Sequence, residues 1–266
     1  MHGTITKNVA AMYAETTRNS EQVSQAIMGQ PVEIEKEEGG WLYIRTWDGY
    51  HGWIEARWVR EGEWSPARIA AVLPAFSYAY RAPDASSGHH TILVVTAAME
   101  ALGTDGKFAR VRLPDGREAW VPANEVSVTP AGDQMLPFGA TGAEIVETGR
   151  RFIGVPYLWG GSSPFGIDCS GFVQLSYKLN GIHLLRDAGI QAGDPRAVPV
   201  EKGDLVAGDL VFFAGGEDKA RITHVGMAVG DGTFIHSSGG AGVGINRLTD
   251  EPYEANYWGA RRMPGV

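Results

Sequence analysis

Residues 168–181 read Asp-Cys-Ser-Gly-Phe-Val-Gln-Leu-Ser-Tyr-Lys-Leu-Asn-Gly and contain the only cysteine of the chain, Cys169. Three apolar residues recur at helical spacing: Phe172, Leu175 and Leu179. This pattern predicts a helix that begins at or near Cys169, with Asp168 as its N-cap and Gly181 near its end. Because unpaired N–H groups and the helix dipole favour a thiolate at this end, Cys169 is a candidate nucleophile.

The segment before the cysteine is rich in glycine. Residues 157–166 read Tyr-Leu-Trp-Gly-Gly-Ser-Ser-Pro-Phe-Gly, which we expect to form a loop whose backbone can approach a ligand closely. A single thiol forms no disulfide within the chain and does not suit a thiolate zinc site. We therefore expect neither a metal nor a cofactor.

Two histidines follow in a predicted hairpin. His224-Val-Gly-Met-Ala-Val alternates small and apolar residues as a half-buried strand does, and Thr-Phe-Ile-His236 follows a Gly-Asp-Gly turn. With a three-residue turn centred on Asp231, His236 lies opposite Gly226, and both histidines share one face as diagonal neighbours roughly 7 Å apart. A register slip of one residue would place them on opposite faces.

The cysteine and the two histidines together suit nucleophilic catalysis. A thiolate peptidase needs an imidazole that carries the proton and a third group that orients this imidazole. Taken singly, His224 and His236 are each typical of partly exposed strand residues, and a two-histidine metal site is another interpretation. No acidic third ligand stands at the usual helical spacing, which favours catalysis over metal binding.

The N-terminal half contains a repeat. Residues 41–49 align without a gap with residues 108–116, an offset of 67, and the same offset pairs Tyr13 with Tyr80. Each copy alternates apolar residues around an Asp-Gly turn, which predicts hairpins within a barrel of about five short strands. The two copies, with a Gly-Trp-Ile or Ala-Trp-Val segment after the hairpin turn, resemble bacterial SH3-like domains.

Two positions differ between the copies in a direction that the fold does not require. Glu15 corresponds to Ala82, and Tyr50 corresponds to Arg117. The first copy therefore carries an acid and a phenol of its own, which suit a cationic group better than the second copy does. The alternative interpretation is that Glu15 and Tyr50 are ordinary polar residues of the surface.

We predict three domains, at residues 1–63, 64–130 and 131–266. Residues 127–142 are rich in proline and glycine and are typical of a linker. A capping box of Thr141 and Glu144 then opens a helix that ends before Pro156. The apolar positions of this helix are Ile145, Gly149, Phe152 and Ile153.

The composition excludes several classes of partner. Lys plus Arg number 23 and Asp plus Glu number 31, so the net charge of −8 favours neither nucleic acid nor an anionic membrane surface. The first residues lack the apolar core of a signal peptide, and no stretch approaches the roughly 18 apolar residues of a membrane span. We expect a monomer without membrane insertion, in the cytoplasm, or in the periplasm or outside the cell if a leader has been removed.

Five ordered motifs resemble one family. They are Tyr157-Leu-Trp-Gly-Gly, Asp168-Cys-Ser-Gly-Phe, Gly208-Asp-Leu-Val-Phe-Phe, His224-Val-Gly-Met and Ile235-His-Ser. In order and spacing, over residues 141–262, they are similar to the NlpC/p-sixty peptidases. The resemblance implies an α+β fold class, with a papain-like catalytic domain preceded by two small all-β SH3-like barrels.

The resemblance also implies an activity. It is hydrolysis of the bond between γ-linked D-glutamate and the diamino acid, diaminopimelate or lysine, of a peptidoglycan stem peptide. Cys169 would be the nucleophile, His224 the base and acid, and His236 the orienting group. Tyr157 resembles the family tyrosine whose hydroxyl, with the backbone N–H of Cys169, stabilises the oxyanion.

Tandem SH3-like domains resemble the YkfC-like branch of the family, which takes peptides with a free N-terminal L-alanine. Glu15, Tyr50, Asp168 and Ser170 match the positions that close the pocket over this amine, and Trp159 is also expected to bind substrate. The expected partner is therefore an L-Ala-γ-D-Glu-diamino acid peptide, and no nucleic acid.

Two other functions stay open. The chain could be an inactive cell-wall-binding protein whose SH3-like pair targets the wall, although a complete set of Cys169, His224 and His236 argues against this. It could also be a related thiol amidase or acyltransferase on the same fold.

Overall fold

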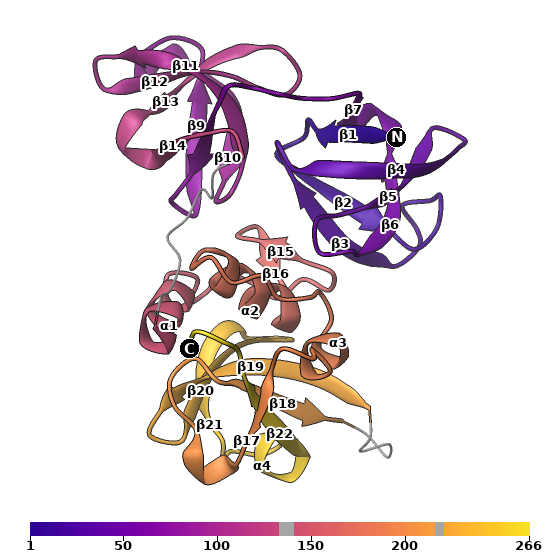
Figure 1. Cartoon of the computed structure of the whole chain (residues 1–266), viewed down its shortest axis with the longest axis vertical. Helices are drawn as coiled ribbons and strands as arrows, with labels where there is room; N and C mark the ends of the chain where they lie inside the picture. Colours follow the sequence, from indigo (N-terminus) through magenta and orange to yellow (C-terminus); the bar gives the residue numbers. More distant parts are fainter. Residues whose placement is uncertain (133–140, 216–220) are drawn as a thin grey trace. The chain divides into compact units, whose positions relative to one another are not determined.

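A computed structural model describes residues 1–132, 141–215 and 221–266 of the chain (Figure 1). The chain forms two compact units, Met1–Met135 and Leu136–Val266. The first unit consists of strands joined by turns, and the second combines helices with a sheet. Short 3-10 helices lie at Ala56–Trp58, Ala85–Ser87, Ala123–Glu125 and Lys202–Asp204.

The first unit contains two seven-stranded antiparallel sheets. The strands of the first sheet are β1 His2–Ile5, β2 Val9–Tyr13, β3 Gln22–Ile27, β4 Pro31–Glu38, β5 Trp41–Arg45, β6 His51–Glu55 and β7 Val59–Glu61. Those of the second are β8 Arg68–Val72, β9 Phe76–Tyr80, β10 His89–Val94, β11 Ala98–Asp105, β12 Phe108–Arg112, β13 Glu118–Pro122 and β14 Val126–Pro130. Their orders are β3-β2-β6-β5-β4-β1-β7 and β10-β9-β13-β12-β11-β8-β14, so the second sheet repeats the first strand for strand.

The repeat extends to single hydrogen bonds. In the first copy the Thr46 N–H donates to the Tyr50 carbonyl at 2.9 Å, and in the second the Leu113 N–H donates to the Arg117 carbonyl at 2.8 Å. The glycine of each Asp-Gly turn has a positive φ, 75° at Gly49 and 93° at Gly116, which explains the choice of residue. The predicted hairpins are therefore confirmed.

An aromatic pair is also duplicated. The rings of Tyr13 and Trp41 meet edge to face with centroids 5.7 Å apart, and those of Tyr80 and Phe108 do the same at 6.0 Å. All four residues keep part of their surface exposed, whereas the alternate residues of their strands fill the two cores. Each pair therefore reaches across the strand between its two members, β6 in the first sheet and β13 in the second, on the face away from the core.

Two predictions about the first unit are wrong. Each copy has seven strands and not about five, because short strands such as β1, which pairs with both β4 and β7, extend each sheet. The predicted linker at 127–142 starts inside β14, whose Val128 packs against the second core. Residues 133–140 of that linker lie outside the described residues.

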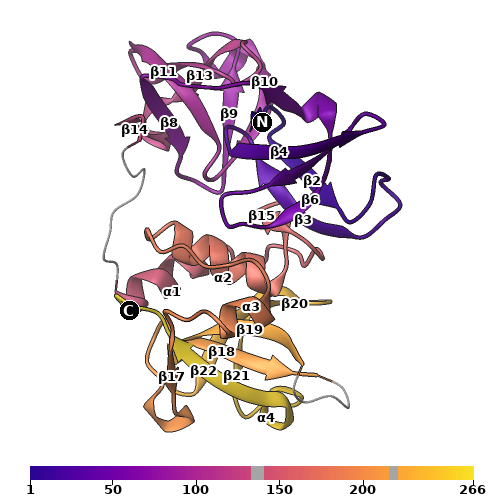
Figure 2. The same cartoon turned by 45° about the vertical axis from the view of Figure 1, so that its right-hand side comes forward.

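The second unit places three helices on one face of a six-stranded antiparallel sheet of order β17-β22-β18-β19-β20-β21 (Figure 2). Its elements are α1 Gly142–Arg150, β15 Ser162–Ser163, β16 Gly166–Ile167, α2 Cys169–Lys178, α3 Ala188–Ala192, β17 Val198–Val200, β18 Leu210–Ala214, β19 Ile222–Gly230, β20 Thr233–Ser238, β21 Gly242–Arg247, α4 Tyr253–Asn256 and β22 Tyr257–Arg262. The helices α1, α2 and α3 all contact β19. This strand therefore lies where the functional residues of helix and sheet can meet.

Helix α1 begins as predicted. The Thr141 hydroxyl and the Glu144 carboxylate form the reciprocal capping box, and Ile145, Gly149 and Phe152 are buried. Ile153 is 52% exposed and does not join the apolar face. It lies beyond the last helical residue, Arg150, so helical spacing no longer fixes its direction.

Helix α2 also begins as predicted. The Asp168 side chain caps it by accepting the Gly171 N–H at 2.7 Å. Gly171 has a second role, because a Cβ there would lie 2.3 Å from the Gly161 carbonyl oxygen. The glycine-rich loop can thus cross the start of the helix closely, and part of it pairs as the short ribbon of β15 and β16.

The histidine hairpin has the predicted register but a different turn. Met227 pairs with Ile235, which places Gly226 opposite His236. The turn has two residues and not three: Gly230 pairs with Thr233, and Asp231 and Gly232 have φ values of 51° and 71°. Positive φ at both central residues is typical of a type I′ hairpin, and a bulge between Ala228 and Gly230 restores the register.

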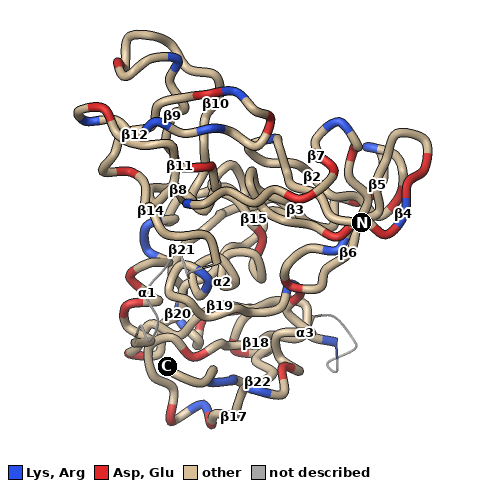
Figure 3. The backbone as a smooth tube through the Cα atoms, turned by 45° about the horizontal axis from the view of Figure 1, so that its top comes forward, with Lys and Arg blue, Asp and Glu red and all other residues tan. Residues whose placement is uncertain are grey.

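Acidic and basic residues are interspersed along the loops and hairpins (Figure 3). Several pair across strands in the first unit, such as Arg45 with Glu33 and Arg112 with Glu100. Within the described residues, every helix is too short or too polar to cross a bilayer.

Gly226 gives a test of the hairpin packing. A Cβ at this position would lie 2.7 Å from Cδ2 of Phe234 and 2.9 Å from the Ile235 carbonyl oxygen. Gly226→Ala should therefore lower the free energy of unfolding by about 1–3 kcal/mol through overpacking. Gly244→Ala is the matched control, since a Cβ there meets no atom within 4 Å. Equal urea midpoints for the two variants would contradict this reading of the hairpin.

Candidate active site

Cys169 is the first residue of α2, and its side chain is buried against β19. The backbone N–H groups of Val225 and Ser170 donate to its sulfur and lower the pKa of the thiol. The removal of the sulfur from water raises this pKa by more. Burial raises the pKa of Cys169 to about 11, with Asp168 adding to the rise. The helix start therefore acts in the predicted direction, but burial has the larger effect, and the thiol needs the base that the sequence also predicts.

His224 and His236 lie on the same face of the hairpin, as predicted. His224 Nε2 is 2.7 Å from His236 Nδ1, and the two rings are nearly perpendicular at 88° with centroids 4.9 Å apart. His236 is buried, and its Nε2 is 3.0 Å from Oδ1 of Asn246 on the next strand. The sequence predicted the pair of histidines but not Asn246.

Burial keeps both imidazoles neutral. Burial, with a smaller contribution from the neighbouring His236, lowers the pKa of His224 to about 3. Burial also lowers the pKa of His236, against which the bond to Asn246 acts. Neutral imidazole is the form that can accept a proton from a thiol.

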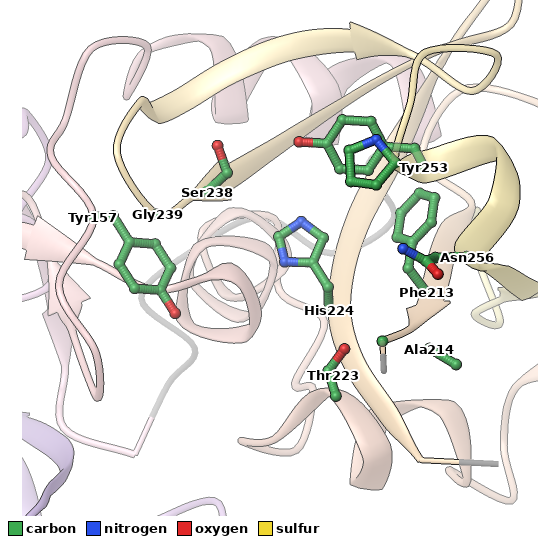
Figure 4. Close-up of a pocket in the computed structure, with 11 residues that line it drawn as sticks. Tyr157, Phe213, Ala214, Thr223, His224, Ser238, Gly239, Tyr253 and Asn256 are labelled. Atoms are coloured by element: carbon green, nitrogen blue, oxygen red, sulfur yellow. The ribbon is translucent and has the colours of Figure 1, made fainter. Parts of the chain in front are cut away.

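A pocket of about 200 Å³ opens beside His224. In Figure 4 the His224 ring lies between the phenol of Tyr157 and that of Tyr253, and Thr223 and Asn256 add polar groups to the wall. Burial raises the pKa of Tyr157 to about 12, and negative charge on Cys169 would raise it as well. The Tyr157 hydroxyl therefore stays protonated near the thiol, where it can donate a hydrogen bond.

Asp168 is part of a buried ion pair. Its two carboxylate oxygens accept from both terminal nitrogens of Arg186, whose side chain is 1% exposed, and Arg186 also donates to the Ser170 hydroxyl at 2.7 Å. A fourth bond runs from Arg186 to the Gly161 carbonyl at 3.3 Å. Arg186 was not predicted from the sequence, because it comes from a segment without periodicity.

The remaining candidate residues lie elsewhere. Trp159, in the glycine-rich loop, is 61% exposed. Glu15 and Tyr50 belong to the first compact unit, in the loops after β2 and before β6. Because Tyr13 pairs with Trp53, both loops leave the sheet at the same end.

Within the described residues, no group of three His, Cys, Asp or Glu side chains could hold a metal ion. A nitrogen of His224 meets a nitrogen of His236, which is the geometry of a hydrogen bond between imidazoles. Independence from metals and cofactors stays a prediction.

The site thus places a buried thiol at a helix start, with its sulfur at the N–H of Val225, and the preceding strand residue, His224, contacts a second imidazole. This is the arrangement of a cysteine hydrolase. The NlpC/P60 family matches residues 154–262, and the bacterial SH3 domain matches residues 8–60.

Similar proteins extend over nearly the whole chain. A gamma-D-glutamyl-L-lysine dipeptidyl-peptidase of Bacillus cereus is 33% identical over 90% of this chain and 74% of its own length. A protein of the same name from Bacillus subtilis is also 33% identical, over 90% of this chain and 80% of its own length. The crystal structure of an NlpC/P60 family protein from Bacillus cereus superposes with a TM-score of 0.86 at 26% identity, covering 98% of this chain and 99% of that one. The chain belongs to the NlpC/P60 family.

Thiol alkylation tests the role of His224 as the base. In His224→Ala, iodoacetamide should alkylate Cys169 slowly at pH 7, because burial raises the pKa of the thiol and no imidazole at position 224 is left to accept its proton.

The wild-type protein is the comparison. Because its neutral imidazole can accept the thiol proton while the sulfur attacks the reagent, we expect alkylation at pH 7 to be at least about tenfold faster than in the variant. Identical pH profiles for the two proteins would show that His224 does not share the proton of Cys169.

Proposed function

We propose that the protein is a cysteine peptidase that hydrolyses the bond between γ-D-glutamate and the diamino acid of peptidoglycan stem peptides. The observation that carries the proposal is the 2.7 Å contact between His224 and His236 beside the buried Cys169. An inactive wall-binding protein would not need this contact. The names of the Bacillus relatives favour the γ-D-glutamyl bond, with lysine as one possible diamino acid and diaminopimelate as the other.

The geometry supports a two-step reaction. His224 takes the thiol proton as the Cys169 sulfur attacks the carbonyl carbon, and the Tyr157 hydroxyl and the Cys169 N–H stabilise the oxyanion. His224 then gives the proton to the leaving amine of the diamino acid, and a thioester remains. Water, deprotonated by His224, releases the γ-D-glutamyl product and restores the thiol, while His236 keeps His224 in place.

We also propose a papain-like layout for the second unit and two SH3-like domains, 1–63 and 64–130, in the first. The papain-like layout is supported by the packing of α2, with its N-terminal Cys169, against the strand that carries His224. The identical strand orders of the two sheets support the SH3-like pair, since the bacterial SH3 domain matches the first copy at residues 8–60.

A free N-terminal amine on the substrate is the next part of the proposal. We assign its binding to Glu15, Tyr50, Asp168 and Ser170, with Trp159 as a further contact. Asp168 already shares its charge with Arg186, so Glu15 is the carboxylate with a negative charge to offer. The name dipeptidyl-peptidase in the relatives supports this, because such enzymes act at a free N-terminus.

The free amine implies a substrate that has left the wall. A stem peptide still joined to glycan through its L-alanine nitrogen has no free amine at that residue. We propose that a monomer in the cytoplasm meets such released fragments.

Substitutions in the catalytic set test the chemistry. Cys169→Ala and His224→Ala should each lower kcat by at least roughly 10³-fold, because nucleophile and proton carrier act as one unit. His236→Ala should be milder, at roughly 10- to 100-fold, since water can partly replace an orienting group. Mass spectrometry of products from L-Ala-γ-D-Glu-diaminopimelate, its lysine analogue and intact sacculi measures this, with thermal unfolding as the control for folding. Full activity in a folded Cys169→Ala protein would end the cysteine-peptidase proposal.

N-acetylation of the peptide tests the amine site. Acetylation removes the charge, so kcat/KM should fall by at least about tenfold, which corresponds to 1.4 kcal/mol. Glu15→Gln and Tyr50→Phe should weaken cleavage of the free peptide and narrow its advantage over the acetylated one.

Arg117→Gln is the matched control, because Arg117 is the repeat partner of Tyr50 and is engaged with Asp115 at 2.6 Å. This variant should keep the wild-type ratio of the two rates. Equal wild-type rates on free and acetylated peptide would move the proposed substrate to intact peptidoglycan.

A further inference from the structure

We propose that Asn246, oriented by Asp250, fixes the tautomers of both histidines and is therefore a positioning residue of the active site. This inference rests on the proposed role of His224 as the base. It adds two residues beyond the cysteine and histidines that the motifs contain.

Asn246 reaches the site from the edge strand of the sheet. It lies on β21 and pairs with Phe234 of β20, so it shares a face with His236 as a diagonal neighbour. Its Oδ1 is 3.0 Å from Nε2 of His236. The rings of Phe234 and Tyr253 pack around the His236 ring, with centroids 4.5 and 5.1 Å away, which leaves the ring edge for this polar contact.

Asp250 decides which end of the Asn246 amide faces His236. The Asn246 Nδ2 lies 3.5 Å from Oδ2 of Asp250, and a carboxylate can only accept a hydrogen bond. The same oxygen accepts the Arg247 N–H at 2.9 Å, and the Asp250 carbonyl accepts the Tyr253 N–H at 2.8 Å. With the NH₂ group directed to this held carboxylate, the amide oxygen must face the histidine.

The orientation of the amide then propagates through both rings. Because the Asn246 oxygen only accepts, His236 must carry its proton on Nε2 and present a lone pair at Nδ1. That lone pair, 2.7 Å away, accepts the proton on Nε2 of His224. His224 Nδ1 is consequently left with a lone pair, which is what a base for the Cys169 thiol requires.

The opposite tautomers would inactivate the base. His224 would then present an N–H at Nδ1 and could not accept the thiol proton. His236 would turn a lone pair at Nε2 towards the Asn246 oxygen, leaving two buried acceptors unsatisfied at a cost of about 1–3 kcal/mol. Removing the amide removes this penalty, so the unproductive tautomers become populated.

Nitrogen NMR of the ¹⁵N-histidine-labelled protein reads the tautomers directly. In wild type, both His224 and His236 should carry their proton on Nε2. Asn246→Leu should show a mixture of tautomers at both residues, and Asn246→Asp should keep the wild-type pattern because a carboxylate also accepts. Ile245→Leu is the matched control, since Ile245 is the preceding residue of β21 and is 39% exposed.

Kinetics on the free tripeptide give the second readout, with thermal unfolding of each variant as the control for folding. Asn246→Leu should lower kcat on the order of 10- to 100-fold with KM changed less than about twofold, whereas Asn246→Asp recovers most of it. A proton on Nδ1 of either histidine in wild type, or an unchanged kcat in folded Asn246→Leu, would overturn the inference. If the wild type shows the expected tautomers but cleaves no peptide, the proposed function fails instead.

Discussion

The burial of the Cys169 sulfur against β19 constrains the rest of the site. Burial disfavours the charged forms of both the thiol and its neighbouring imidazole. The thiol proton therefore has to pass between groups whose positions are fixed. This requirement fits the direct hydrogen bond between His224 and His236 and the contact of His236 with the side-chain amide of Asn246. It also explains why the loop before the cysteine is tied down, with the Ser237 hydroxyl donating to the Ile167 carbonyl at 2.7 Å.

Much of this arrangement is local in sequence and could be predicted. The start of α2 follows from an N-cap and helical spacing, and the facing histidines follow from the two-residue period of a strand. The predicted register is correct although the predicted turn is not, because the bulge before Gly230 compensates for a turn that is one residue shorter than predicted. The capping box of α1 and the duplicated hairpins are equally local features.

Other features depend on packing between distant segments. Arg186 has no periodic neighbours, yet it is among the most deeply buried side chains and ties Asp168 to the glycine-rich loop. The thiol pKa depends on how completely β19 covers the sulfur, which no helix-end argument measures. Asn246 could have been found only by adding the third strand of the hairpin sheet and placing Gly244 opposite His236.

The duplicated ring pairs of the first unit join strands and include no residue of the hairpin turns. Tyr13 with Trp41 and Tyr80 with Phe108 clamp equivalent strands, while the turn residues at Tyr50 and Arg117 lie outside either clamp. The residue at this turn can therefore differ between the copies while the ring contact stays the same. For protein engineering, the Asp115-Gly116 turn is then a place to insert a new recognition loop, because the ring pair of Tyr80 and Phe108 does not include its residues.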